Sequence, residues 1–290
     1  MQCPKEIQGG TTRDLAAVVG NSVVVGSASK RARRRESVLT WAVVDHHPLF
    51  EGARISEASR KGRQSLPLTI EGGDVLVFSP SLVCIGASER TSWSMIVHLA
   101  EELLDAGISR VLVVEMPKQR SSMHLDTVFT LTDWDRCAVY RPLLQRGSRE
   151  EASITRLRRG EQGTIVEKLP GDLLDCLSAE GHPLQPTFCG GGHPVHERRE
   201  QWTDGANYVA LCPGVVVGYA RNQHTAREMS DAGYQVLDPP TFLSCFEQQH
   251  QGSVDELISS GQRYAIHIRG SELSRGRGGP RCLTLPLQRD

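Results

Sequence analysis

The sequence has no excess of either charge and no long apolar run. Lys and Arg number 33 and Asp and Glu number 34, which gives a formal net charge of -1 over 290 residues. Because a domain that binds phosphates usually carries a basic excess, this balance argues against nucleic acid as a partner. No apolar stretch approaches the ~20 residues of a membrane-spanning helix. We therefore expect neither nucleic acid nor a membrane among the partners.

Closely spaced cysteine pairs are also missing. None of the eight cysteines stands in a C-x-x-C pair, so zinc-ribbon and thioredoxin-like readings find no support. The first ten residues, MQCPKEIQGG, contain no apolar segment of the kind that a secretory signal has. We therefore expect reduced thiols in a cytoplasmic protein.

The length suits one large domain or two small ones, and no strong linker divides the chain. We interpret 1–290 as a single catalytic domain. Residues 239–262 are predicted to form a helical insertion before the last strand, RYAIHIRG. The charged segment 147–163 is predicted to be a loop or a solvated edge.

A repeated unit is the strongest pattern in the chain. DVLVFSPSLVCIGASERTS, from Asp74, and NYVALCPGVVVGYARNQHT, from Asn207, each have two apolar runs around a short turn, then Gly and Arg. Similar segments begin at Asp14 and, more loosely, at Asp126. Such runs predict β-hairpins, and helical patterns such as Met95, Leu99 and Leu103 follow some of them. The recurring unit is therefore hairpin, helix and strand, or ββαβ, which favours an α/β fold around a pseudo-symmetry axis.

The four units begin with a polar residue at an equivalent position. Asp and Asn are common turn residues at strand starts, and each of them alone is best interpreted that way. Four in register favour one shared polar site.

Several other residues could carry chemistry. Cys282 follows Arg281, and a thiol next to positive charge can act as a nucleophile, although free cysteines are often buried in the core. His124 and Asp126 share one face if they lie on a strand, although a lone His-x-Asp is more often an ordinary hydrogen-bonded pair. In EGGD, two glycines between Glu71 and Asp74 let the backbone approach another group closely.

Converging carboxylates need a cationic companion, which a guanidinium substrate would supply. Arginines near the same mouth, such as Arg90, would suit a substrate carboxylate. Together they describe a zwitterionic guanidino acid. The terminal GSELSRGRGGPRC could instead be an RNA-binding tail, but one Gly-Arg-Gly is far short of a repeated tract.

The longest motifs resemble the arginine deiminases of the guanidino-group-modifying (pentein) superfamily. The resemblance runs in order from Thr12 to Leu287, through these strings: TRD, ARRRE, EGGDVLV, IGASERTS, MHLDTVFT, ERREQWTDGANYVAL, PGVVVGYARN and GSELSRGRGGPRC. It implies a pseudo-five-fold α/β propeller of ββαβ units around a central active site. It also implies hydrolysis of L-arginine to L-citrulline and ammonia without a metal or another cofactor.

The resemblance implies a role for each site residue. Cys282 resembles the nucleophile, and His124 the general acid and base. Glu71 is similar to the carboxylate that supports His124, while Asp14 and Asp126 resemble the pair that grips the guanidinium.

It also implies a set of substrate-binding residues. Arg33 and Arg90 resemble the clamp on the substrate carboxylate. Arg277 is similar to a mobile arginine near the nucleophile, and Asp74 to a neighbouring support.

The start of the chain departs from the family pattern. Gln8 stands where the family has an asparagine that helps to hold substrate, Thr11 where a phenylalanine lines the pocket, and Leu15 where a proline follows Asp14. We expect the first blade to be incomplete. Three explanations stay open: the sequence is truncated or its start is wrongly assigned, another chain completes the ring, or the protein is a degenerate paralogue.

Two alternatives to an arginine deiminase stay open. One is a deiminase or amidinotransferase that acts on another guanidino compound. The other is an inactive paralogue that keeps the motifs. A homo-oligomer is also left open.

Overall fold

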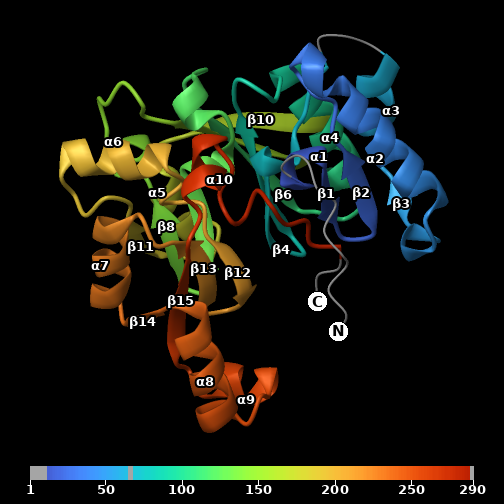
Figure 1. Ribbon diagram of the computed structural model, residues 1–290. Coiled ribbons are helices and arrows are strands. Elements are labelled where there is room, and N and C mark those ends of the chain that lie inside the picture. The colour runs from blue at the N-terminus through green and yellow to red at the C-terminus, as the bar shows by residue number, and fades with distance from the viewer. Residues whose placement is uncertain (1–11, 65–67, 288–290) are drawn as a thin grey trace.

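Four ββαβ units in succession build the fold. The structure, a computed structural model, describes residues 12–64 and 68–287, and these ranges contain four separate sheets (Figure 1). In the first three units an antiparallel hairpin is followed by a strand that pairs in parallel with its second strand. The predicted hairpins at Asp14, Asp74, Asp126 and Asn207 are all confirmed.

The first unit is small, and its hairpin is buried on both faces. Every residue of both hairpin strands is buried, which fits their unbroken apolar runs better than an alternating pattern. The turn between them contains Gly20 in the left-handed region, at φ +54°. The elements of this unit are α1 (Thr12–Leu15), β1 (Ala16–Val19), β2 (Ser22–Val25), η1 (Arg31–Arg33), α2 (Arg34–His46), η2 (Pro48–Phe50), β3 (Arg54–Ile55) and α3 (Glu57–Gln64).

The second unit contains the largest sheet, in the order β10-β9-β6-β5-β4. Its helix α4 buries Met95, Leu99 and Leu103 at the predicted four-residue spacing, and Gly107, at φ +104°, ends the turn that follows. The elements are η3 (Gly72–Asp74), β4 (Val75–Ser79), β5 (Leu82–Ala87), α4 (Trp93–Asp105), β6 (Arg110–Glu115) and η4 (Arg120–Ser122).

The charged segment 147–163 is not a loop throughout, so this prediction was wrong in part. Residues Ser153–Gly160 form β9, which pairs antiparallel with β6, and Gly163–Leu169 form the edge strand β10. Ile154 and Leu157 point into the core. Arg156 donates to Glu180 at 2.8 Å and to Glu167 at 2.6 Å. Because charged side chains such as Arg156 pair with acidic residues outside the core, this highly charged segment can form a strand.

The third unit places its third strand beside its hairpin, as in the first two. β11 pairs in parallel with β8, and α5 lies between β10 and β11 in the chain. The elements are η5 (Leu125–Thr127), β7 (Phe129–Asp133), β8 (Arg136–Val139), η6 (Arg141–Leu143), α5 (Leu173–Ala179), β11 (Gln185–Phe188) and α6 (Pro194–Trp202).

The fourth unit differs because a later strand takes the central place. Its order is β12-β13-β15-β14, so that β15 pairs in parallel with both β13 and β14. The segment 239–262, predicted to be a helical insertion, contains the helices α8 and α9, which extend away from the rest of the molecule (Figure 1). The elements are β12 (Val209–Cys212), β13 (Val215–Tyr219), α7 (Gln223–Asp231), β14 (Tyr234–Leu237), α8 (Pro239–His250), α9 (Val254–Ser259), β15 (Arg263–Ile268) and α10 (Ser271–Arg275).

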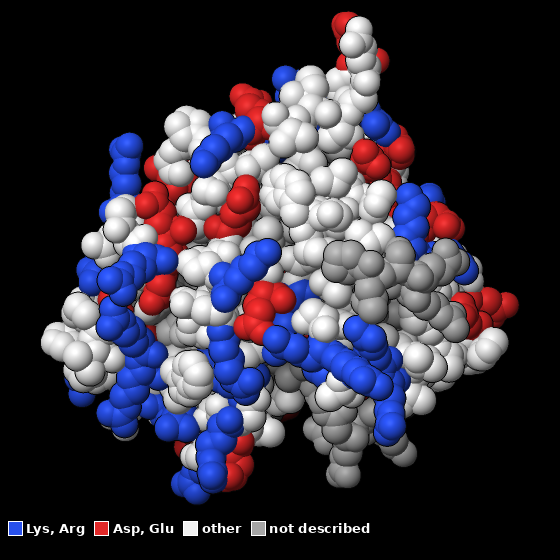
Figure 2. All heavy atoms as spheres, turned by 90° about the horizontal axis from the view of Figure 1, so that it is seen from above, with Lys and Arg blue, Asp and Glu red and all other residues white. Residues whose placement is uncertain are grey.

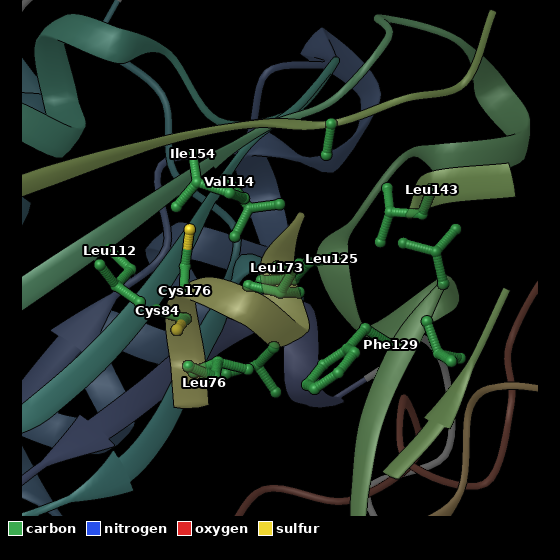
Figure 3. Close-up of a cluster of buried hydrophobic side chains, with 14 of the residues drawn as sticks. Leu76, Cys84, Leu112, Val114, Leu125, Phe129, Leu143, Ile154, Leu173 and Cys176 are labelled. Atoms are coloured by element: carbon green, nitrogen blue, oxygen red, sulfur yellow. The ribbon is translucent and has the colours of Figure 1, made fainter. Parts of the chain in front are cut away.

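The largest hydrophobic cluster joins the second unit to the third. Figure 3 shows Leu173 and Cys176 of α5 among the side chains of Leu112 and Ile154, with Phe129 of β7 nearby. Because this core is shared, the two units hold each other's strand ends in fixed relative positions.

Charges of both signs lie on the surface. On the face in Figure 2, Lys and Arg side chains cover much of the lower half of the view, with acidic side chains among them. No helix within the described ranges is long and apolar enough to cross a membrane. The seven cysteines in those ranges form no disulfide, and five of them are buried.

The packing of α4 leads to a prediction about stability. Leu99 is 0% exposed and Leu39, on α2, is 68% exposed. Leu99→Ala should lower the free energy of unfolding by about 2–5 kcal/mol, because it leaves a cavity in the core. Leu39→Ala should change it by less than about 0.5 kcal/mol. Urea titration of both variants measures the difference, and equal midpoints would contradict the assigned packing.

Candidate active site

The four polar residues that begin the units lie in one connected region. The Leu125 amide donates to Asp74 Oδ1 at 2.8 Å, which links the second unit to the third. Asn207 Nδ2 donates to the Asp126 carbonyl at 2.7 Å, which links the third to the fourth. Asp14 Oδ1 lies 3.4 Å from His124 Nδ1, which links the first to the third. The four unit starts therefore lie near one another, and their role as one shared polar site stays a prediction.

The glycines of EGGD allow the close approach that the sequence predicts. A Cβ on Gly72 would lie 2.2 Å from the carbonyl oxygens of Arg13 and Ala16, and a Cβ on Gly73 would lie 2.9 Å from His124 Cγ. Real Cβ atoms do not approach so closely. The first and third units can therefore meet at Glu71 only because both positions lack a side chain.

His124 lies buried between two carboxylates. Its Nε2 is 2.9 Å from Glu71 Oε2, and its Nδ1 faces Asp14. Burial by itself lowers the pKa of His124, but the negative charges of Asp14, Glu71 and Asp74 outweigh it and raise the pKa to about 10. The imidazole is therefore held as a cation at neutral pH and has a proton to donate.

Asp74 supports this arrangement from the second unit. Its carboxylate accepts hydrogen bonds from the hydroxyls of Ser88 at 2.7 Å and Thr91 at 2.6 Å, besides the Leu125 amide. Complete burial raises the pKa of Asp74 to about 7, against the lowering effect of His124 and of these donors. Asp74 thus ties the start of β4 to the segment that carries His124.

The guanidinium of Arg33 joins the same carboxylates. Arg33 Nη1 donates to Asp14 Oδ2 at 2.7 Å and to Glu71 Oε2 at 3.1 Å, while Nη2 donates to Glu36 at 2.8 Å. Burial alone lowers the pKa of Arg33, but the three carboxylates raise it above its ordinary value. In this structure a guanidinium therefore already bridges two of the residues expected to act on a substrate guanidinium.

Arg90 lies on the other side of Glu71. Its Nη1 is 3.6 Å from Glu71 Oε1, and the residue is buried. The buried Nε and Nη1 of Arg90 make no hydrogen bond to any residue that the structure describes. Arg90 thus keeps donor capacity for another group.

Cys282 is held by atoms from two distant units. Its amide donates to Asn207 Oδ1 at 3.2 Å, its carbonyl accepts from the Arg13 amide at 3.0 Å, and its Sγ lies 3.5 Å from Asn207 Oδ1. Burial raises the pKa of the Cys282 thiol well above its ordinary value, and the negative charges of Asp126, Asp14 and Asp204 raise it further. The free protein therefore holds Cys282 as a neutral thiol.

Arg277 lies in the loop that precedes Cys282 and takes a left-handed backbone conformation, at φ 63°. Its guanidinium donates to the carbonyls of Trp202 at 2.6 Å and Ser121 at 2.7 Å, and lies over the Trp202 ring. Burial lowers the pKa of Arg277, partly offset by Asp204 and Cys282. The structure thus places Arg277 beside the site; its predicted mobility stays a prediction.

Asp126 is a buried carboxylate that is paired with one arginine. It is fully buried, and neither side-chain oxygen accepts a hydrogen bond from a residue in the described ranges. Arg281 Nε is 3.4 Å from its Oδ2. Burial raises the pKa of Asp126, against the lowering effect of Arg281 and His124. Asp126 therefore has free acceptors for a cationic ligand.

The sequence interpretation missed the site roles of three residues. Asn207 appeared only as a strand start, although it contacts Cys282. Arg281 was noted only as a neighbour of the thiol, and Asp204 was not singled out. Asp204 is buried with neither carboxylate oxygen hydrogen-bonded within the described ranges, and burial raises its pKa to about 7. The string ERREQWTDGANYVAL contains both Asp204 and Asn207, so a signal was present.

The remaining expectations concern a metal ion and the residues near the start of the chain. Ligand atoms of Asp14, Glu71 and His124 lie within 4.8 Å of one another, so these residues could hold a metal ion. Arg33 places a guanidinium on both carboxylates, so the absence of a metal stays a prediction. Gln8 and Thr11, expected to alter substrate binding, lie outside the described residues, whereas Leu15 is the last residue of α1 and directly precedes β1.

The comparison with known protein families decides the family. A family model described as arginine deiminase matches residues 11–289, nearly the whole chain. This chain belongs to the arginine deiminase family. An arginine deiminase of Listeria monocytogenes serovar 1/2a is 37% identical over 287 residues, covering 96% of this chain. That of Latilactobacillus sakei subsp. sakei is 34% identical over 294 residues, again covering 96%.

The chain is shorter than these members of the arginine deiminase family. It spans about 60% of the length of the Listeria protein and 61% of the Latilactobacillus protein.

Solved structures share the fold at low sequence identity. The product-bound N-terminal domain of ArgZ, an arginine dihydrolase from cyanobacteria, has a TM-score of 0.59 at 15% identity, covering 96% of this chain and 74% of the other. A dimethylarginine dimethylaminohydrolase adduct with S-methyl-L-thiocitrulline has a TM-score of 0.54 at 16% identity, covering 95% and 75%. These likenesses show a mixed α/β fold in common with both proteins.

The raised pKa of His124 predicts a pH dependence of stability. The folded protein keeps the His124 proton up to about pH 10, whereas an ordinary histidine loses it near 6.5. This contribution to stability is complete below pH 6.5 and is lost as the pH rises through 10. Between pH 7.5 and 9 the free energy of unfolding should therefore fall by up to about 1.4 kcal/mol per pH unit from this group.

His124→Gln should remove that part of the slope in urea titrations. His267→Gln is the matched control, since His267 is also buried but burial lowers its pKa to about 4. It should leave the slope between pH 7.5 and 9 unchanged. A wild-type slope in the His124 variant would contradict the assigned charge.

Proposed function

We propose that this protein is an arginine deiminase, which hydrolyses L-arginine to L-citrulline and ammonia with Cys282 as nucleophile. The observation that carries the proposal is the convergence of Asp14, Glu71, His124 and Asp126 beside the buried Cys282, within a chain of the arginine deiminase family. The named relatives are arginine deiminases, which supports arginine as the substrate.

Binding begins with an exchange of guanidinium groups. The substrate guanidinium takes the carboxylates of Asp14 and Asp126, and Arg33 leaves Asp14 and Glu71 to make room for it. Arg33 and Arg90 then hold the substrate carboxylate, for which Arg90 has unused donors. Displacing one guanidinium by another keeps the carboxylates paired throughout, so that no charge is left buried alone.

The substrate also activates the nucleophile. Before binding, the charges of Asp126, Asp14 and Asp204 oppose a thiolate at Cys282. A guanidinium held by Asp14 and Asp126 offsets that field, and the thiol loses its proton to water. The thiolate then attacks the guanidinium carbon and forms a C–S bond in a tetrahedral adduct.

His124 then manages the protons of both half-reactions. As an imidazolium beside Glu71, it protonates the departing amino group. The C–N bond breaks, ammonia leaves, and an S-alkylthiouronium remains on Cys282. Neutral His124 takes a proton from water, whose oxygen attacks the same carbon. The second adduct releases citrulline as the C–S bond breaks, and Cys282 recovers a proton. Asp74 supports this arrangement through its bond to the Leu125 amide.

Arg277 acts at the entrance of the nucleophile loop. Gly276 and Gly278 flank it, and α10 precedes it. We propose that the loop moves Arg277 towards bound substrate, where its charge helps to stabilise the thiolate.

The architecture and setting of the protein belong to the same proposal. The four ββαβ units occupy four positions of a pseudo-five-fold propeller. The polar residue at the start of each unit lies near the axis of that propeller. The first unit has the shortest third strand, β3, of two residues. Residues 1–290 act as one catalytic domain of a cytoplasmic hydrolase, which needs no metal or other cofactor. A homo-oligomer is compatible with this proposal.

The first test asks whether citrulline formation depends on Cys282. Cys282→Ala should abolish citrulline formation from L-arginine, because the nucleophile is lost. Cys212→Ala, at a partly exposed cysteine on β12, should keep it. A colorimetric citrulline assay with thermal melts of all three proteins measures this. Citrulline from the Cys282 variant would refute the proposed nucleophile, and a folded, inactive wild type would favour the inactive paralogue.

The carboxylate clamp gives a second test. Arg90→Lys should raise KM for L-arginine by roughly 10-fold, since one charge-assisted hydrogen bond is lost. It should change KM much less for agmatine, which has the guanidinium but no carboxylate. Arg90 also lies beside Glu71, and an indirect effect through Glu71 would change KM equally for arginine and agmatine. The ratio of the two KM values therefore measures the contact of Arg90 with the substrate carboxylate. Efficient wild-type turnover of agmatine in place of arginine would favour the alternative guanidino substrate.

A further inference from the structure

Asn207 is a buried residue that touches the nucleophile through one end of its side chain. Its Oδ1 accepts the Cys282 amide at 3.2 Å and lies 3.5 Å from Cys282 Sγ. Its Nδ2 donates to the Asp126 carbonyl at 2.7 Å. One side chain thus spans the distance between the cysteine and the segment that carries a guanidinium-binding carboxylate.

We propose that Asn207 is a positioning residue that sets the place of the Cys282 sulfur relative to Asp126 through the two ends of its amide. The proposal rests on the proposed function, because it gives that sulfur and that carboxylate their roles. Attack on a carbon held by Asp126 requires the sulfur at a fixed distance, and misplacement by about 1 Å can cost on the order of 100-fold in rate.

The packing around the amide leaves little freedom for it to move. A Cβ on Gly279 would lie 2.2 Å from Asn207 Oδ1, so the loop before Cys282 passes directly against this side chain. The backbone N–H of Asn207 donates to the Asp204 carbonyl at 3.1 Å, which fixes the backbone of Asn207. Asn207 is fully buried. A side chain with both ends bonded and no space beside it has a single position.

Two other hydrogen bonds hold the loop through its backbone carbonyls and not through the sulfur. The Arg13 amide donates to the Cys282 carbonyl at 3.0 Å, and Tyr219 Oη donates to the Gly278 carbonyl at 2.6 Å. These contacts end on backbone carbonyls. Within the described ranges, the side-chain partner of Cys282 Sγ is Asn207 Oδ1, and the backbone amide of Gly279 also hydrogen-bonds the sulfur.

The neutrality of the amide also matters for the thiol. The charged and titratable groups that act on Cys282 are Asp126, Asp14 and Asp204, with Arg277, Arg281 and Tyr219. Three carboxylates already oppose a thiolate. Asn207 supplies an acceptor for the S–H group and a donor for Asp126 without adding a fourth negative charge.

The test reads the Cys282 thiol directly, without turnover. Wild type, Asn207→Asp and Asn207→Ala are alkylated with iodoacetamide from pH 6 to 11 under native conditions. The modified fraction of the Cys282 peptide is measured by mass spectrometry. Asn207→Asp keeps the shape but adds a charge, so its profile should move up by about one pH unit. Asn207→Ala removes the S–H acceptor, so its profile should not move up.

Kinetics on arginine add a second readout. Asn207→Ala should lower kcat roughly 100-fold with KM nearly unchanged, because substrate still binds while the sulfur is misplaced. Should the chain not act on arginine, the alkylation profiles still test the position of Asn207, so the two proposals fail separately.

Asn222 offers a matched control in the same unit. It is equally buried, with Nδ2 donating to the Thr203 carbonyl at 3.0 Å and Oδ1 accepting from Thr203 Oγ1 at 2.6 Å. Asn222→Asp and Asn222→Ala should cost stability in thermal melts but leave the alkylation profile of Cys282 unchanged. The proposal would be overturned if both Asn207 variants gave the wild-type alkylation profile. It would also be overturned if the Asn222 variants shifted the Cys282 profile as much as the Asn207 variants do.

Discussion

The buried groups Asp14, Glu71 and His124, together with the half-buried Arg33, form the cluster of charges on which the rest of the site depends. Each of these charges would be costly to bury alone, and each is stabilised by an opposite charge within about a hydrogen bond's length. The cationic His124 and the guanidinium of Arg33 compensate the two carboxylates. A site balanced in this way accepts another guanidinium readily, because the incoming cation replaces one of the same kind.

The repeated units explain how these charges come together. Each unit begins with a polar residue directly before its hairpin, and the hairpins are anchored by apolar strands and helices. Sharing a core between units fixes those starts relative to one another, as Leu112 and Phe129 do for the second and third units. Gly72 and Gly73 then allow the first unit to approach to backbone contact. The polar site is thus a consequence of apolar packing outside it.

Cys282, the proposed nucleophile, reaches the cluster from the far end of the chain. Arg13 and Asn207, from the first and fourth units, hold the backbone of Cys282, and the surrounding carboxylates keep its thiol neutral. A reactive sulfur is therefore unreactive until a cation enters. Under the proposed function, the same carboxylates would bind the substrate guanidinium and govern when the thiol ionises, so that substrate recognition would be coupled to activation.

The sequence by itself determined the repeated unit, the four polar starts, the role of glycine in EGGD and the candidate site residues, because each depends on local pattern or on long motifs. The sequence did not predict those elements whose position depends on contacts between residues far apart in the chain. Segment 153–160 forms a strand because Arg156 finds Glu180 and Glu167, and β15 enters between β13 and β14 for reasons that local pattern does not contain. Only the tertiary structure placed Arg33 on Asp14 and Glu71 and Asn207 against Cys282. Hydrogen bonds and ion pairs between residues far apart in the chain leave no periodic trace in the sequence, so folding alone decides them.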